Sequence, residues 1–373
     1  MANNYELLRD YLVDCYIRLK GYCDDGHWVA DGILDQAAKN LLRPVNFTDI
    51  DNLPQYGEEP VQDLYCIRYL YAYAYEYREM FRRLLEQQAG NLTEMNILSI
   101  GCGTGVDLWG ACEAQAMMRR KYGVERDIEY TGLDLADWNH KWGDEARLPG
   151  VAAHYQTGET EGDAVRYLED HQEDLRQNIF VFPKSITEIA KDSDVLSRMF
   201  HAFANAKFDP DFDKIHFLVS FPYGREIDNE GNYEWVKDRL TEAMGINGYS
   251  LESEEAAEIQ FGSDDAIGWL EWKHCSDPDM GAYYGGARAF YNSFRFTYEF
   301  YKTGDENDSD QKKYYKGYER IDEEEGFTDL LAKLVDDRDA NKDDAEKNNI
   351  YNPAWYASHI CYQVITFVRG EQV

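Results

Sequence analysis

A short apolar stretch that leads directly into three closely spaced glycines constrains the fold of this chain most strongly. Residues 96–105 read NILSIGCGTG, and a helical pattern begins at Val106. The glycines at alternate positions are Gly101, Gly103 and Gly105. Glycine permits backbone dihedrals and close approaches that a side chain would forbid. The segment therefore predicts a strand, a tight turn suited to a nucleotide-like ligand, and a helix over about residues 106–121.

A second apolar stretch, residues 128–135, supports a nucleotide-binding sheet because it ends with an acid, Asp134. In Rossmann-like sheets, an acid at the end of the second strand accepts hydrogen bonds from ribose hydroxyls. The dinucleotide pattern G-x-G-x-x-G is not met, because Val106 stands where its last glycine would be. Turn, strand and acid in this order are more specific than a glycine motif alone.

The G-x-G-x-G turn followed by a strand that ends in Asp134 resembles motif I and the next strand of class I S-adenosylmethionine-dependent methyltransferases. The resemblance covers residues 96–223 and fades on both sides. It implies an α/β fold with a Rossmann-like methyltransferase sheet, and S-adenosylmethionine as the cofactor. The cofactor-binding residues that it implies are Ser99, Gly101, Cys102, Gly103, Gly105, Asp134, Leu135 and Asp163. Replacing Asp134 by alanine is expected to weaken cofactor binding with little effect on folding.

Three residues around the turn need their own interpretation. Ser99 stands where the family usually has Asp or Glu, and a serine hydrogen-bonds without charge. Asp107 either supplies the missing charge or is an acid favoured by the helix dipole. Cys102 has no basic neighbour, which favours a small turn residue over a nucleophile.

A third strand is expected at residues 151–155, and residues that follow the second and third strands are candidates for the adenine contact. By the resemblance, Leu135 lines the adenine pocket, and Trp138 either does the same or packs as an ordinary aromatic residue. An acid after the third strand often binds the adenine amino group in this family. Here that acid is either Asp163 or Glu159.

Two later strands are expected at residues 178–183 and 214–220, and the residues at their ends are suited to bind a methyl acceptor. Ligands of parallel α/β sheets bind at the carboxyl ends of strands, so Lys184, Ser185 and Tyr223 are the candidate catalytic residues. Ser185 is alternatively the N-cap of the next helix. The positive charge of Lys184 at a strand end in an acidic protein predicts an anion nearby. Lys184 and Tyr223 lie outside the cofactor motifs, so their replacement is expected to spare S-adenosylhomocysteine affinity.

The apolar periodicity outside these motifs predicts the remaining organisation of the chain. We expect a helical N-terminal cap at 1–90, a methyltransferase-like core at 91–302, an acidic, partly helical or flexible insertion at 303–349, and a returning strand at 350–373. Pro60 begins a long helix with six tyrosines, which form either an aromatic wall over a ligand or a packing surface. The last strands of the sheet are expected at 294–300 and 360–367.

The amino-acid composition limits which kinds of partner and which compartment we expect for this chain. The chain has 71 acidic and 38 basic residues, a formal charge of −33, which repels phosphate and makes nucleic acid an unlikely substrate. No apolar stretch is long enough to cross a membrane, and the N-terminus lacks a signal pattern, so we expect a cytoplasmic protein with no membrane partner. The seven cysteines form no disulfide framework, and the dispersed histidines predict no metal site.

Together these features predict transfer of a methyl group from S-adenosylmethionine to an O, N or S atom of a small molecule or protein. The sulfonium already activates the methyl group, so the protein mainly aligns the acceptor and excludes water. The alternative is a non-catalytic S-adenosyl-binding or protein-interaction protein with the same fold. Ser99 and the acidic insertion favour this alternative. The sequence predicts neither the acceptor nor the oligomeric state.

Overall fold

The computed structural model describes residues 11, 14, 15, 18, 56, 59–88, 91–139, 141–142, 150–221, 232–260 and 359–370. Compactness divides the chain into two units, the first with Met1–Tyr71 and Gln260–His359, the second with Ala72–Ile259 and Ile360–Val373. The predicted cap at 1–90, the strand at 294–300 and the insertion at 303–349 fall largely or wholly outside the described residues, so the domain limits stay predictions.

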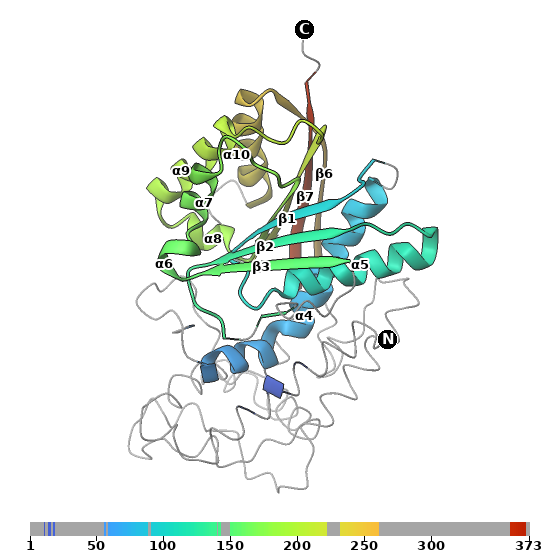
Figure 1. Ribbon diagram of the computed structural model, residues 1–373, viewed down its shortest axis with the longest axis vertical. Coiled ribbons are helices and arrows are strands. Elements are labelled where there is room, and N and C mark those ends of the chain that lie inside the picture. Colours follow the sequence, from blue (N-terminus) through green and yellow to red (C-terminus); the bar gives the residue numbers. More distant parts are fainter. Residues whose placement is uncertain are drawn as a thin grey trace, which may run out of the picture. The chain divides into compact units, whose positions relative to one another are not determined.

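Seven strands form one sheet (Figure 1). They are β1 (Met95–Ile100), β2 (Ile128–Asp134), β3 (Val151–Thr157), β4 (Ile179–Pro183), β5 (Lys214–Phe221), β6 (Tyr249–Gln260) and β7 (His359–Arg369). Their order across the sheet is β3-β2-β1-β4-β5-β7-β6. Strands β1 to β5 pair in parallel, and β7 pairs antiparallel with β5. The carboxyl ends of β1, β2, β4 and β5 therefore lie along one edge of the sheet, where α/β folds bind ligands.

Helices connect the parallel strands. The described helices are α4 (Glu59–Gln87), α5 (Val106–Tyr122), α6 (Gly158–Glu161), α7 (Ala164–Asp170), α8 (Ile186–Ile189), α9 (Ser193–Asn205) and α10 (Asn232–Ile246). Helix α4 has Pro60 in its first turn, where the missing N–H leaves no hydrogen bond unmade. Helix α5 ends at Gly123, whose N–H donates to the Arg119 carbonyl in a left-handed cap.

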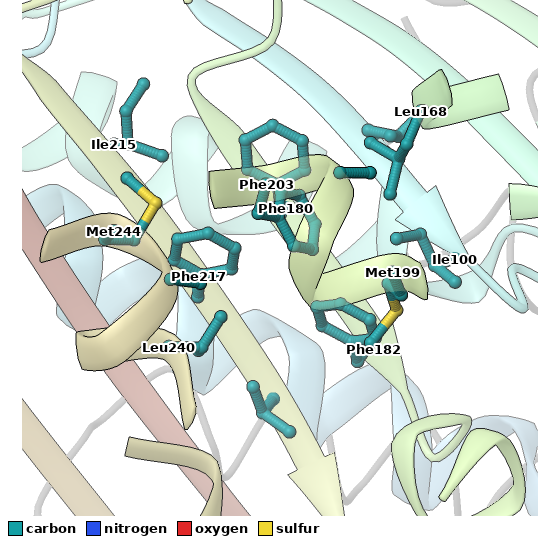
Figure 2. Close-up of a cluster of buried hydrophobic side chains, with 14 of the residues drawn as sticks. Ile100, Leu168, Phe180, Phe182, Met199, Phe203, Ile215, Phe217, Leu240 and Met244 are labelled. Carbon is teal, nitrogen blue, oxygen red and sulfur yellow. The ribbon is translucent and has the colours of Figure 1, made fainter. Parts of the chain in front are cut away.

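One face of the sheet packs against α7, α9 and α10 around a cluster of buried hydrophobic side chains (Figure 2). Alternate residues of each strand point to this face. The Phe180 ring of β4 stacks on Phe217 of β5 at 5.2 Å between centroids. It also meets Phe203 of α9 edge-on at 5.1 Å. These rings are fully buried and fix the spacing of β4, β5 and α9.

The opposite face carries polar side chains that reach helices α4 and α5. The Tyr130 hydroxyl of β2 donates to Asp107 of α5 at 2.9 Å. The Ser220 hydroxyl of β5 donates to Glu76 of α4 at 2.5 Å. Buried hydrogen bonds thus link both helices to the sheet, in addition to their buried apolar side chains.

The observed elements confirm most of the predicted ones. Strands β1 to β5 and helix α5 lie where the sequence predicts them, and the predicted strand at 360–367 lies inside β7. Strand β6 was not predicted, because its sequence YSLESEEAAEIQ has few apolar residues. It is one of the two edge strands of the sheet, a position that tolerates charged side chains.

Two further properties concern only the described part of the chain. None of its helices is both long and apolar enough to cross a membrane. Its His, Cys, Asp and Glu side chains form no group of three or more that would hold a metal ion.

Candidate functional site

The glycine turn after β1 requires glycine for two reasons. Gly101 and Gly105 both have φ of 75°, a left-handed conformation that other residues rarely adopt. A Cβ atom on Gly101 would also lie 2.6 Å from the Cβ of Ser185, and one on Gly105 would overlap the Tyr155 hydroxyl. Close approach of the protein itself therefore excludes a side chain at Gly101 and at Gly105.

Asp134 binds the turn directly. One carboxylate oxygen accepts a hydrogen bond from the Gly103 N–H at 2.8 Å, and the other accepts from the Ala136 N–H at 2.8 Å. Burial raises the pKa of this carboxyl, while those two N–H groups oppose the rise. A carboxylate oxygen can accept two hydrogen bonds, so the Asp134 side chain can still accept hydrogen bonds from the hydroxyls of a ligand.

The segment after β2 folds back over the turn. The Trp142 N–H donates to the Thr104 carbonyl at 2.7 Å. Trp138 is buried, and its ring lies 3.6 Å from the position that a Cβ of Gly103 would occupy. Leu135, in contrast, is 63% exposed beside Asp134, which leaves an apolar side chain uncovered at the end of β2.

Beneath the turn, Ser99 and Asp107 lie together. Both are fully buried, and Asp107 accepts the hydrogen bond from Tyr130. Burial raises the pKa of Asp107 to about 6, although the side chains of Ser99 and Tyr130 act to lower it. The helix thus brings a carboxyl group to the uncharged Ser99, where the family usually has an acid. The Cys102 thiol is also buried, which raises its pKa and disfavours the reactive thiolate.

Asp163 has a clear local role in the structure. One of its carboxylate oxygens accepts from the Val165 N–H at 2.9 Å and from the Arg166 N–H at 3.2 Å. The side chain therefore caps the first turn of α7. Its contact with adenine stays a prediction.

Lys184, at the end of β4, is engaged within the protein. Its ammonium donates to both carboxylate oxygens of Glu76 at 2.7 Å and to the Phe221 carbonyl at 2.7 Å. It also lies 5.1 Å from the centre of the Tyr73 ring. The anion predicted near Lys184 is therefore Glu76, a residue of α4. All three donors of its ammonium are used within the protein, and the catalytic role of Lys184 stays a prediction.

Sequence reasoning missed Glu76. Its side chain is fully buried and also accepts the hydrogen bond from Ser220. Burial raises the pKa of Glu76, and Lys184 and Ser220 oppose the rise. The available signal was an acid among the tyrosines of this helix, in the run AYAYEY, but its partner lies 108 residues away.

Ser185 does not cap a helix with its side chain. It occupies the N-cap position of α8, but its hydroxyl donates to the Ile100 carbonyl at the end of β1. The N-cap position is the one that the sequence suggests, whereas the hydrogen bond of the Ser185 side chain to β1 was not predicted. Tyr223, the third candidate catalytic residue, lies outside the described residues.

The order of the strands decides the fold. Five parallel strands in the order β3-β2-β1-β4-β5 are followed by the antiparallel β7 beside β5, and the glycine turn and Asp134 stand at the ends of β1 and β2. The chain has the class I methyltransferase fold. No family model and no curated protein matches its sequence.

Solved structures with this methyltransferase fold resemble the chain at low identity. Phosphoethanolamine N-methyltransferase 2 of Haemonchus contortus, in complex with S-adenosyl-L-methionine, is 10% identical with a TM-score of 0.33; the match covers 80% of this chain and 57% of that one. The plantazolicin methyltransferase BpumL, in complex with SAH, is 10% identical with a TM-score of 0.34, over 91% and 99% of the two chains. A putative class I methyltransferase from Listeria monocytogenes is 13% identical with a TM-score of 0.33, over 69% and 83%. Because the TM-scores lie below 0.5, the fold assignment rests on the sheet itself.

Proposed function

We propose that this chain binds S-adenosylmethionine at the glycine turn and transfers its methyl group to an O, N or S atom of an acceptor. The observation that carries the proposal is Asp134, which stands at the end of β2 and is hydrogen-bonded to Gly103 of the turn. A carboxylate with spare acceptor capacity beside a glycine of the turn suits the hydroxyls of a ribose, which supports the proposal.

The described residues around Asp134 fit the other parts of this cofactor. Leu135 offers an exposed apolar side chain to a flat base, next to the proposed ribose contact. Gly103 presents its Cα to a space in which a Cβ would make only ordinary contacts, with Trp138 beside it. When bound, the cofactor supplies an electrophilic methyl group on a sulfonium.

The acceptor would lie at the carboxyl ends of β4 and β5, which run parallel to β1 and end on the same edge of the sheet as the glycine turn. There the work of the protein is alignment and exclusion of water, since an activated methyl group needs little further chemical help. The charge of −33 supports a small-molecule or protein acceptor over nucleic acid. No described side chain at these ends offers an unpaired positive charge, since Lys184 is held by Glu76.

The alternative is a non-catalytic S-adenosyl-binding protein. The uncharged Ser99 and the engagement of Lys184 inside the protein favour it. A chain of this kind would bind the cofactor at the same turn but transfer no methyl group.

Two measurements, made one after the other, test the proposal. Calorimetric titration is expected to show binding of S-adenosylhomocysteine, with thermal stabilisation of the protein, and no binding of NAD. Binding of NAD without any S-adenosyl binding would refute the cofactor assignment. Incubation with methyl-labelled S-adenosylmethionine and fractionated cell extract then separates an enzyme, which labels an acceptor, from a binding protein, which labels none.

A further inference from the structure

We propose that the Glu76–Lys184 ion pair positions the glycine turn through Ser185, so that helix α4 sets the affinity for the cofactor. The inference rests on the proposed function, because it concerns the same site. It assigns Glu76, Lys184 and Ser185 as positioning residues that act on the ligand through the turn.

The first step is the anchoring of the β4 end to α4. Glu76 is fully buried and Lys184 has 11% of its side chain exposed, so water competes little for their contact. The carboxylate receives two hydrogen bonds from the ammonium and one from Ser220. The third ammonium proton is donated to the carbonyl of Phe221. The ion pair thus joins one helix to the ends of two neighbouring strands.

The ion pair also holds the backbone of Lys184 in an uncommon conformation. Its φ is 64°, and among the described residues it is the one non-glycine residue with a positive φ. A residue that has a side chain keeps this backbone conformation only where surrounding contacts hold it. The contacts that hold it here are those of its own ammonium group with Glu76 and Phe221.

The third step leads from Lys184 to the turn. The next residue, Ser185, donates its hydroxyl proton to the carbonyl of Ile100, the last residue of β1. Its Cβ also lies against Gly101, where an added Cβ would be 2.6 Å away. Ser185 therefore touches the glycine turn at its first residue, and the direction of its side chain depends on the conformation of Lys184.

These steps give an expectation opposite to that from the sequence. Lys184 lies outside the cofactor motifs, which suggested that its replacement would spare S-adenosylhomocysteine affinity. We expect instead that loss of the ion pair lets Ser185 move, so that its contact no longer fixes the position of Gly101. Close-packed interiors transmit such displacements because they have no free volume in which to absorb them.

The test compares Lys184→Met with the double variant Glu76→Gln/Lys184→Met. The single variant leaves a buried carboxylate unpaired and is expected to lose stability, whereas the double variant replaces the pair by neutral groups of similar size. Both are expected to bind S-adenosylhomocysteine about 5- to 10-fold more weakly than the wild type, toward the lower end of usual couplings between sites. Ser185→Ala is expected to do the same, and its effect in the double-variant background should be smaller than alone.

Lys214→Met is the matched control, because Lys214 also pairs with a carboxylate, that of Glu252 at 2.7 Å, but at the opposite end of β5. It should leave S-adenosylhomocysteine affinity unchanged. A double variant that keeps native thermal stability and native affinity would overturn the inference.

Hydrogen exchange of the unliganded protein separates the two proposals. Amides of the turn, residues 101–105, are expected to exchange faster in the double variant than in the wild type. Unchanged exchange at the turn would overturn the positioning role, whatever the ligand. A wild type that binds no S-adenosylhomocysteine, yet shows faster exchange in the variant, would overturn the proposed cofactor and keep the positioning role.

Discussion

The buried carboxyl of Asp107 makes the stability of this protein depend on pH in a direction opposite to that of most acids. Its pKa is about 6 in the folded protein, against about 3.9 for an unfolded aspartate. The folded state therefore binds this proton more tightly than the unfolded state. Stability from this group is fully present below about pH 4 and is lost as the pH rises through about 6.

The size of the effect follows from the pKa. At pH 5 the protein lies one unit below the folded pKa, and one unit corresponds to about 1.4 kcal/mol. Above pH 7 the group is ionised in both states and contributes no further change. Between pH 5 and pH 8, Asp107 should therefore lower the free energy of unfolding by about 1.4 kcal/mol.

Asp107→Asn removes this titration and keeps an oxygen that accepts from Tyr130. Urea unfolding of wild type and variant at pH 5, 6, 7 and 8 gives the difference between their free energies of unfolding. We expect this difference to shift by about 1.4 kcal/mol in favour of the variant between pH 5 and pH 8, and most of the shift to occur below pH 7. Asp170→Asn, the same substitution at the exposed end of α7, is the matched control variant.

A second variant tests the assigned cause. The Tyr130 hydroxyl lowers the pKa of Asp107 by donating to it. Tyr130→Phe should therefore move the midpoint of the pH effect upward. A difference between wild type and Asp107→Asn that stays constant from pH 5 to pH 8 would refute the reasoning, since it would mean that Asp107 titrates in the ordinary range.

Two further expectations concern the turn itself. Asp134→Ala should weaken S-adenosylhomocysteine binding, measured by calorimetry; contrary to the sequence-based expectation, it should also lower the unfolding free energy by about 1.5–3 kcal/mol, because the carboxylate accepts from Gly103 and Ala136. Equal urea midpoints for wild type and variant would contradict the second part. Gly105→Ala should destabilise the protein by more than Gly123→Ala, because both glycines have positive φ but only Gly105 also faces Tyr155. The Gly123 control should lose about 1–2 kcal/mol, the usual cost of the left-handed backbone, and equal losses would show that Tyr155 moves away freely.

The sequence contained enough local information for the first half of the sheet. Strands β1 and β2, helix α5 and the acid at position 134 were predicted because apolar periodicity, glycine and a terminal acid are signals within a few residues of one another. The same reasoning found β4 and β5, whose apolar runs are buried on both faces. Strand β6 gave no such signal, because an edge strand needs little apolar surface.

The roles of the polar side chains were decided only by the tertiary structure. The sequence placed Lys184 at the end of β4 and predicted an anion nearby, but the anion is Glu76, 108 residues away on α4. It placed Ser185 before a helix, but its hydroxyl bonds to Ile100 on a neighbouring strand. Periodicity reports which face a residue takes, whereas the partner of a buried charge depends on which distant segment the fold packs against it. For that reason the sequence determined the fold and the glycine turn, and the tertiary structure alone decided that helix α4 holds the ends of β4 and β5 through a buried ion pair.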